Sequence, residues 1–341
     1  MSAEAETGPL AAPIRFGVLL PSFDPMHTGS TPALVEAARR AEELGFDAAW
    51  VGDHLWGHAP WLESTVALGA AAAVTDRLTL GFSVMLLGLR SPVWAAKQIQ
   101  SLSALSGGRL VLGVGVGGEY PEEFEAAGVP VGKRGKRLDE ALTVLPDLLL
   151  GRRVDYEGST LAVHANPLAP AMARLPPILV GGRGEVAIRR TVRHGDGWLP
   201  MWLSPEVVIE RGERLRELAA DSGRARPTIT LLILVHVDDS LERSREVAAE
   251  HLAGQYKLPL HVVERWAALG PRERVAERLQ AYLDAGVTEL ILMALGGDQL
   301  AQYERLAKVC ATLTAVPANL GRFAGSGMAA ELLEDRAAEP N

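Results

Sequence analysis

Asp53 and His54 are the neighbouring residues in this sequence best suited to acid–base chemistry. They follow residues 48–51, an apolar run that is typical of a buried strand. An imidazole changes its charge near neutral pH, and a nearby carboxylate can orient it. The pair therefore predicts proton transfer by His54, with Asp53 tuning it. The alternative is a structural pair in which Asp53 caps the following loop.

The histidines also raise a metal-site hypothesis. His54 and His58 are four residues apart, but the segment between them contains Gly57 and is followed by Pro60, which argues against a helix. No third ligand stands at a diagnostic spacing. We therefore expect no metal.

A glycine-rich segment follows the apolar run at residues 110–116. Gly115, Gly117 and Glu119 belong to it, and glycine lets the backbone approach a flat ring closely because it has no Cβ. It follows the fourth expected strand and does not open the chain's first βα unit, so it matches the dinucleotide-binding fingerprint poorly. We interpret it as a candidate cofactor contact.

A second glycine-rich turn directly precedes a helical pattern at residues 185–193. It consists of Gly181, Gly182, Arg183 and Gly184. The free N–H groups at a helix start attract anions, and an arginine adds a charge-assisted bond. The turn predicts a phosphate site, with a tight turn that binds nothing as the alternative.

Strand-like and helix-like segments alternate from Ile14 onward, which indicates a parallel sheet with helical crossovers. Eight such units favour a single α/β domain, a (β/α)8 TIM barrel, over a doubly wound sheet of five or six strands. A barrel presents the ends of its strands, including Asp53 and His54, at one face. The expected strands are residues 15–20, 48–51, 78–85, 110–116, 178–180, 197–200, 229–235 and 289–293.

Two segments are too long for ordinary connections. Residues 152–177 predict a hairpin-like insertion after the fourth helix, and residues 255–269 a second insertion before the last helix–strand pair. We expect one domain over residues 14–320, with flexible tails at 1–13 and 321–341.

The charge and composition of the chain limit the classes of molecule that it is expected to bind. The net charge is −8 over 341 residues, which disfavours nucleic acid and anionic membranes. Cys310, the one cysteine, lies among apolar residues, and no segment resembles a signal peptide or a membrane span. These features predict a cytoplasmic protein that acts on a small molecule.

From Ile14 to about Val316 the chain resembles the luciferase-like monooxygenase family, the flavin and F420 oxidoreductases related to bacterial luciferase. The most specific stretches are residues 50–54 (WVGDH), 106–115 (SGGRLVLGVG), 181–182 (GG) and 195–198 (GDGW). The resemblance implies a reduced flavin or deazaflavin F420 ring in the barrel mouth, with its phosphate near Gly181, Gly182 and Gly184.

The resemblance also assigns residues around the ring. Asp53 and His54 match positions on its reactive side, and Ser83 and Val84 match a bulge behind it. The family bulge implies a non-prolyl cis peptide at Ser83–Val84. F420 is slightly favoured over FMN, and a basic cluster is available for its acidic tail, consisting of Lys133, Arg134, Lys136 and Arg137.

Substrate and partners are less constrained. In F420-dependent sugar-phosphate dehydrogenases a tryptophan follows the histidine at a fixed distance, but His58 occupies that place here. Trp56, Trp61 and Trp202 instead suggest an apolar or aromatic organic substrate. We expect a homodimer through the helices at residues 66–74 and 93–105, and a separate cofactor reductase is a further candidate partner. The alternatives are an FMN-dependent monooxygenase that uses O2, a non-catalytic flavin-binding barrel subunit and, on the same barrel, a metal-assisted hydrolase.

Overall fold

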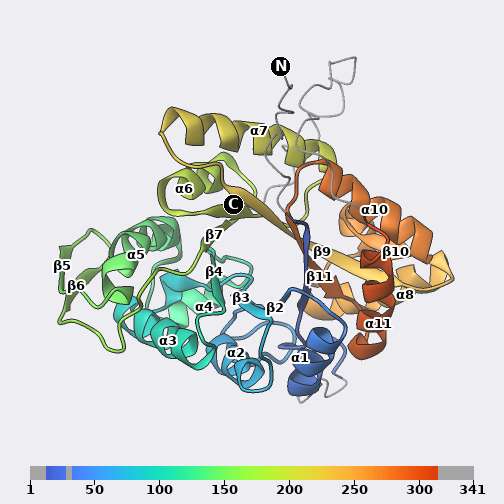
Figure 1. Ribbon diagram of the computed structural model, residues 1–341, viewed down its shortest axis with the longest axis horizontal. Helices are drawn as coiled ribbons and strands as arrows, with labels where there is room; N and C mark the ends of the chain where they lie inside the picture. Colours follow the sequence, from blue (N-terminus) through green and yellow to red (C-terminus); the bar gives the residue numbers. More distant parts are fainter. Residues whose placement is uncertain (1–12, 28–32, 314–341) are drawn as a thin grey trace, which may run out of the picture. The chain divides into compact units, whose positions relative to one another are not determined.

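Eight parallel strands close into a barrel (Figure 1). The computed structural model describes residues 13–27 and 33–313. Each strand pairs with the next along the ring, and the ring closes where β9 pairs with β8 on one side and with β11 on the other. The strands are β1 (Arg15–Leu19), β2 (Ala48–Val51), β3 (Thr79–Phe82), β4 (Leu110–Val114), β7 (Ile178–Gly181), β8 (Gly197–Leu199), β9 (Thr228–Val237) and β11 (Glu289–Ala294). The predicted TIM barrel is confirmed.

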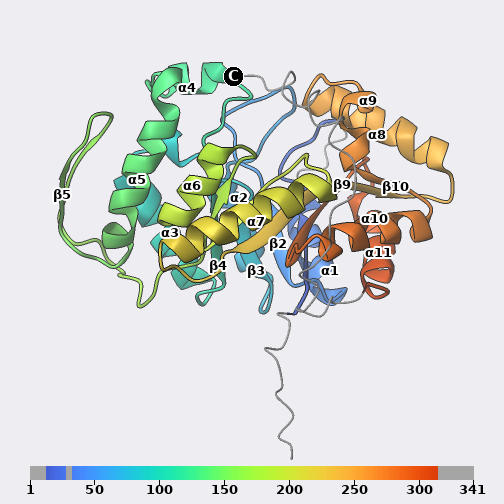
Figure 2. The ribbon, with the colours of Figure 1, turned by 90° about the horizontal axis from the view of Figure 1, so that it is seen from above.

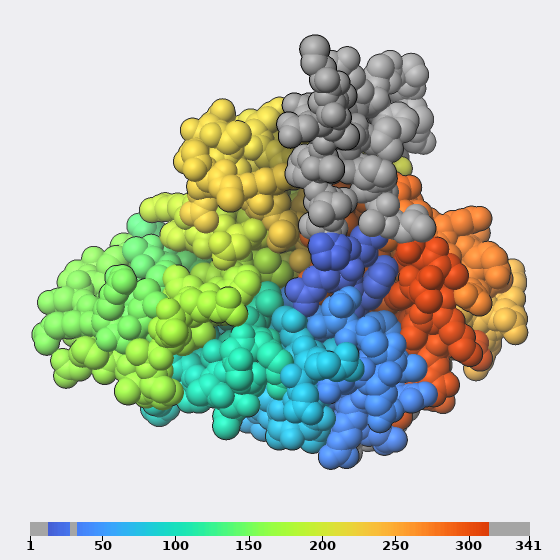
Figure 3. All heavy atoms as spheres, in the orientation of Figure 1, coloured from blue at the N-terminus to red at the C-terminus, as the bar shows by residue number. Residues whose placement is uncertain are grey.

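Helices surround the barrel, and those between consecutive strands form the crossovers that parallel pairing requires. In Figure 3 the residues of α2 (Ser64–Ala72) and α3 (Pro92–Leu105) form part of the visible outer surface. No helix among the described residues is long and apolar enough to cross a bilayer. The surrounding helices are α1 (Leu34–Glu43), α2 (Ser64–Ala72), α3 (Pro92–Leu105), α5 (Arg134–Leu149), α6 (Glu185–His194), α7 (Pro205–Asp221), α8 (Leu241–Gln255), α10 (Arg272–Asp284) and α11 (Gln299–Cys310).

The barrel interior is packed around the indole of Trp50, which is fully buried. Its neighbours on β1 and β3 are Gly17 and Gly81, and a Cβ at either position would lie 2.5 Å or 2.2 Å from the indole. Trp50 Nε1 donates to Oε1 of the buried Glu289 at 3.2 Å. The large ring fits because its two neighbours lack side chains.

The third strand is shorter than predicted. The sequence predicts an extended segment over residues 78–85, but β3 ends at Phe82. Pairing with β4 resumes only as an isolated bridge between Met85 and Val114. The Ser83–Val84 peptide is cis, as predicted.

The first predicted insertion is a hairpin outside the barrel, beside α5 (Figure 1). Its strands are β5 (Val154–Glu157) and β6 (Ala162–Ala165). Glu140 on α5 anchors its turn by accepting hydrogen bonds from the backbone and hydroxyl groups of Ser159 and Thr160. Burial opposes ionisation of Glu140, but these donors outweigh it and lower its pKa to about 2.

The second predicted insertion contains α9 (Leu260–Val263) and a strand that the sequence did not predict, β10 (Ala268–Gly270). β10 pairs with the last residues of β9, outside the eight-stranded ring. A further unpredicted element is α4 (Pro121–Ala126), after β4. In Figure 2, α4 and α9 lie along the same edge of the barrel.

Some expectations lie outside the described residues. These are the predicted tails, apart from Pro13, and residues 314–320 of the predicted domain. The segment from Ile14 to Thr314 forms one compact unit.

Candidate active site

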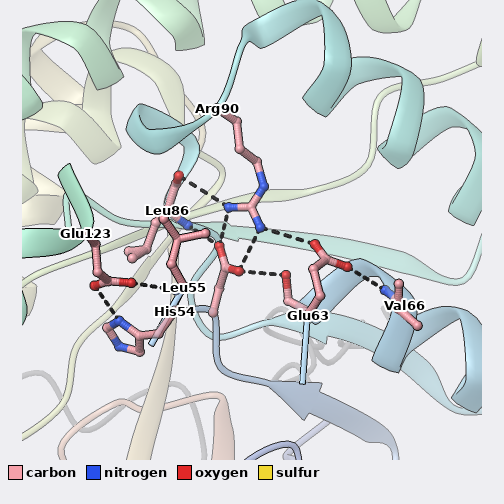
Figure 4. Close-up of polar contacts among 9 residues, drawn as sticks. His54, Leu55, Glu63, Val66, Leu86, Arg90 and Glu123 are labelled. Atoms are coloured by element: carbon pink, nitrogen blue, oxygen red, sulfur yellow. Dashed lines mark hydrogen bonds and ion pairs between the residues drawn. The ribbon is translucent and has the colours of Figure 1, made fainter. Parts of the chain in front are cut away.

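His54 lies just after β2, and both nitrogens of its ring face carboxylates. Nδ1 is 2.8 Å from Oε1 of Glu123 on α4, and Nε2 is 3.2 Å from Oε2 of Glu119 in the loop after β4. The Glu123 side chain is fully buried and that of His54 is 11% exposed, whereas that of Glu119 is 45% exposed. Figure 4 shows the contact with Glu123. The sequence placed Glu119 among the cofactor contacts and missed Glu123 altogether.

Glu123 holds the backbone as well as the ring. Its second oxygen, Oε2, accepts a hydrogen bond from the Leu55 N–H at 2.6 Å. One carboxylate therefore fixes two successive residues after β2. α4 begins at Pro121, so Glu119 lies outside the helix and the four-residue spacing of the two glutamates is not a helical pairing that the sequence could have revealed.

The two carboxylates raise the pKa of His54. Burial of the ring disfavours its charged form, but the hydrogen bonds and charges of Glu119 and Glu123 outweigh that penalty and raise the pKa to about 9. The direction of this shift favours the imidazolium form at neutral pH, with a proton on each nitrogen.

Asp53 does not orient His54, which corrects the sequence-based prediction. Its carboxylate forms a bidentate pair with Arg90, at 2.5 Å and 2.8 Å (Figure 4). It also accepts from the Ser64 hydroxyl and the Leu86 N–H, both at 2.8 Å. Asp53 thus joins the loops after β2 and β3 to the start of α2.

Aromatic rings surround His54. The Trp61 ring centroid lies 4.8 Å from that of His54 and the Tyr120 centroid 5.0 Å, both in edge-to-face geometry. His58 is exposed and packs its edge against Tyr120. Of the three predicted substrate tryptophans, Trp61 alone contacts His54, and Trp56 is 43% exposed on the loop surface.

The third predicted tryptophan lies against the second insertion. Trp202 packs edge-to-face on Tyr256 at 5.1 Å and stacks with Trp266 at 6.4 Å. Tyr256, which the sequence analysis missed, immediately follows α8, and burial, with the Glu119 charge contributing, raises its pKa well above the ordinary value. The backbone carbonyl of its neighbour Gln255 accepts from the Tyr120 hydroxyl at 2.8 Å. The two aromatic groups are thereby linked.

The cis peptide at Ser83–Val84 is flanked closely by the two glycine-rich segments. A Cβ at Gly115 would lie 2.2 Å from Val84 Cγ2, and one at Gly181 would lie 2.9 Å from Val84 Cγ1. The Ser83 hydroxyl is buried and has no hydrogen-bond partner within the described residues. A buried polar atom of this kind suits a polar ring or ligand edge. Gly117 packs instead against Leu86 and Phe124.

The turn before α6 is open at Gly184. Gly184 is the N-cap of α6, and a Cβ there would meet nothing within 4 Å. Gly182 has φ +123° and its carbonyl accepts from Trp198 Nε1 at 2.7 Å, which fixes the turn. The Arg183 carbonyl accepts from Arg211. Open space at the N-terminus of a ten-residue helix fits an anionic group.

The basic cluster at the start of α5 is only partly available. Arg137 donates to the carbonyls of Gly88 and Thr160, both at 2.8 Å, so part of its guanidinium is already engaged within the chain. Arg134 donates to the Val131 carbonyl. Within residues 13–27 and 33–313, no three His, Cys, Asp or Glu side chains are grouped to hold a metal ion.

The model of the luciferase-like monooxygenase family matches residues 14–268, so the chain belongs to this family. An uncharacterised protein of Mycobacterium bovis is 38% identical over 168 residues, which are 49% of this chain and 58% of the relative. The chain therefore spans little more than half the length of that relative. An F420-dependent glucose-6-phosphate dehydrogenase of Microbacterium testaceum is 31% identical over 332 residues, covering 85% of this chain and 94% of the relative.

Solved structures share the fold. An F420-dependent secondary alcohol dehydrogenase in complex with an F420–acetone adduct has a TM-score of 0.76 at 20% identity, covering 87% of this chain and 98% of that one. The oxygenating constituent of 3,6-diketocamphane monooxygenase from Pseudomonas putida, in complex with FMN, has a TM-score of 0.72 at 18% identity, covering 89% and 99%.

We predict that Asp53→Ala lowers the free energy of unfolding far more than Glu63→Ala does. The substitution leaves Arg90 without its buried partner, which typically costs about 3–5 kcal/mol. Glu63→Ala is the matched control, because Glu63 contacts the same arginine at 3.2 Å but is 43% exposed. It should cost about 0.5–2 kcal/mol through loss of the α2 N-cap. Urea unfolding measures both, and equal losses would contradict the structural role of Asp53.

Proposed function

We propose that this chain is an oxidoreductase that transfers a hydride between an F420-type deazaflavin and a small, apolar or aromatic organic substrate. The observation that carries the proposal is His54, held between Glu119 and Glu123 at the ends of the barrel strands. The chain's membership of the luciferase-like family supports the same conclusion. We propose an enzyme rather than a non-catalytic subunit because a histidine whose pKa is strongly raised by two specific carboxylates, just after a barrel strand, is typical of a functional site.

Three groups of residues would hold the cofactor. Val84, Gly115 and Gly181 offer a close-packed backbone surface for one face of a ring, and the Ser83 hydroxyl is free for one of its polar edges. The turn before α6 would take the phosphate. When bound, the deazaflavin would supply the hydride carrier that the chain's own residues lack.

His54 would move the proton that accompanies the hydride. Its Nε2 faces the partly exposed Glu119, so this nitrogen can exchange its partner for a substrate oxygen. Glu123 keeps the ring in place through Nδ1, and Asp53 fixes the loops beneath it. Positioning of this kind is a large part of enzymatic rate enhancement.

The rings near His54 support an apolar or aromatic substrate. The indole N–H groups of Trp61 and Trp202 are buried and have no hydrogen-bond partner within the described residues. Each could donate to one polar atom of an otherwise apolar molecule. The relative named for glucose-6-phosphate is similar over most of its length, but the surroundings of His54 here are aromatic, so we do not extend that substrate to this chain.

The choice of cofactor is tested by fluorescence titration. We predict that F420 binds at least about ten-fold more tightly than FMN, a difference of about 1.4 kcal/mol. The similarity to F420-dependent relatives supports this choice. Tighter binding of FMN, with oxygen consumed during turnover, would favour the alternative of an FMN-dependent monooxygenase that receives reduced flavin from a separate reductase.

The phosphate turn is tested by Gly184→Ala. The φ of Gly184 is −83°, so alanine fits the backbone, but its methyl group would enter the open space before α6. We predict an affinity loss of about ten-fold for F420 and FMN but little change for the phosphate-free chromophores, riboflavin included. Gly69→Ala on α2, which also meets nothing within 4 Å, is the control. An equal loss for the phosphate-free forms would place the anion elsewhere.

His54→Ala tests the catalytic role. Loss of the imidazole should lower kcat about 10²–10⁴-fold, the range for a general acid or base, while the dissociation constant of the cofactor stays within error. Steady-state kinetics combined with the fluorescence titration separates the two. A variant that turns over like the parent would reduce His54 to a structural residue.

We also propose that the chain is a homodimer through α2 and α3. Val66, Trp94 and Leu105 expose 72%, 71% and 74% of their surface, and Trp94 and Leu105 share one side of α3 because they are eleven residues apart. Trp94→Glu should shift a dimer to monomers in sedimentation equilibrium. Ile209→Glu on α7, a position 43% exposed, is the control. A parent protein that sediments as a monomer would contradict the proposal.

A further inference from the structure

The two ring nitrogens of His54 face groups that, when ionised, can only accept hydrogen bonds. Glu123 Oε1 lies 2.8 Å from Nδ1, and Glu119 Oε2 lies 3.2 Å from Nε2. A neutral imidazole has one N–H and one lone pair, so its lone pair would point at a carboxylate oxygen. The arrangement is satisfied without repulsion when both nitrogens carry a proton.

The two carboxylates differ in what they can exchange. The Glu123 side chain has no exposed surface, and both of its oxygens are used, on His54 Nδ1 and on the Leu55 N–H. A buried carboxylate that loses its donor is left with a large desolvation cost. Glu119 is 45% exposed and can turn to water. A ligand can therefore replace Glu119 on Nε2, but not Glu123 on Nδ1.

The other charged or titratable groups near His54 do not offset the negative charge of Glu119 and Glu123. On its own loop, Asp53 is paired with Arg90, and His58 packs on Tyr120 at the surface. From the loop after β4, Tyr120 packs its ring on His54 and donates its hydroxyl to the Gln255 carbonyl. Tyr256, after α8, lies near Glu119 and stays neutral because it is buried.

We infer that Glu123 is a positioning residue that holds His54 in its doubly protonated form. The proton that His54 gives up is the one on Nε2, so this active site is built to reduce a carbonyl substrate. The inference rests on the proposed function. In the reaction the hydride from a reduced deazaflavin bonds to the carbonyl carbon, the C=O π electrons move to oxygen, and the oxygen takes the Nε2 proton. The substrate gains two electrons, the deazaflavin loses two, and His54 is left as the Nδ1–H tautomer on Glu123.

His54 can be reprotonated at Nε2, the same nitrogen that gives up the proton. Once the alcohol leaves, Nε2 faces Glu119 again, and Glu119 is open to water. Glu119 can thus relay a proton from solvent to Nε2 while Nδ1 stays bonded to Glu123. The two carboxylates therefore have separate roles: Glu123 holds the ring in place, and Glu119 returns a proton to Nε2.

Nitrogen-15 NMR of the His54 ring in the cofactor-free protein tests the inference without turnover. In the parent, both ring nitrogens should be protonated at pH 7, and the ring should titrate near pH 9. Above the transition, Nδ1 should keep its proton. Glu119→Gln should retain the Nδ1–H tautomer, whereas Glu123→Gln should move the neutral ring toward Nε2–H, because the buried acceptor has lost its charge.

A parent whose His54 is neutral at pH 7, or whose neutral ring is the Nε2–H tautomer, overturns the inference even if Glu123→Gln fails to fold. Such a result leaves the F420 titration untouched, so the two proposals fail separately.

The pH profile of turnover gives a second readout. Carbonyl reduction by the parent should be constant from neutral pH and fall about ten-fold for each unit above the His54 transition, because the acid form is lost. Glu123→Gln should move this fall to lower pH and lower kcat more than it raises KM. A profile that moves in Glu119→Gln but not in Glu123→Gln would assign the positioning role to Glu119 instead and overturn the inference.

Discussion

The carboxylate of Asp53 is the group on which the arrangement of the active site depends. It accepts from Arg90, from the Ser64 hydroxyl and from the Leu86 N–H, so its hydrogen-bonding capacity is spent on the loops after β2 and β3. The neighbouring His54 must therefore find its acceptors in another part of the chain. They come from the loop after β4 and from α4, which crosses over to the β2 end of the barrel mouth. Because the Asp53 carboxylate has no capacity left for His54, the carboxylates that contact His54 are those of Glu119 and Glu123.

Because Asp53 and His54 have separate partners, the pKa of His54 is raised. Asp53 neutralises Arg90, while Glu119 and Glu123 both act on the imidazole. Burial alone would lower the pKa of His54, but two close carboxylates reverse the sign. The surrounding rings of Trp61 and Tyr120 limit the access of water, which strengthens each of these interactions.

The sequence predicted the eight strands, the hairpin insertion and the importance of residues 53–54, because apolar runs and glycine turns are local signals. It missed α4, since six residues are too few for a helical period to show. It also paired Asp53 with His54, although successive side chains of an extended segment point in opposite directions. The true partner, Glu123, is 69 residues away, and a contact at that separation leaves no local trace. For the same reason the tertiary contacts of Arg137, with the Gly88 and Thr160 carbonyls, could not be predicted.

The contacts of His54 are all encoded early in the chain. The histidine, both carboxylates and the Asp53 network lie between β2 and α4, whereas the anion turn before α6 and the ring of Tyr256 come from later units. The contacts that fix His54 therefore do not depend on the units that follow α4. Substitutions in those later units can change the surface around Trp202 and the turn before α6 while the contacts of His54 stay as they are, so one barrel can keep one part constant while another diverges.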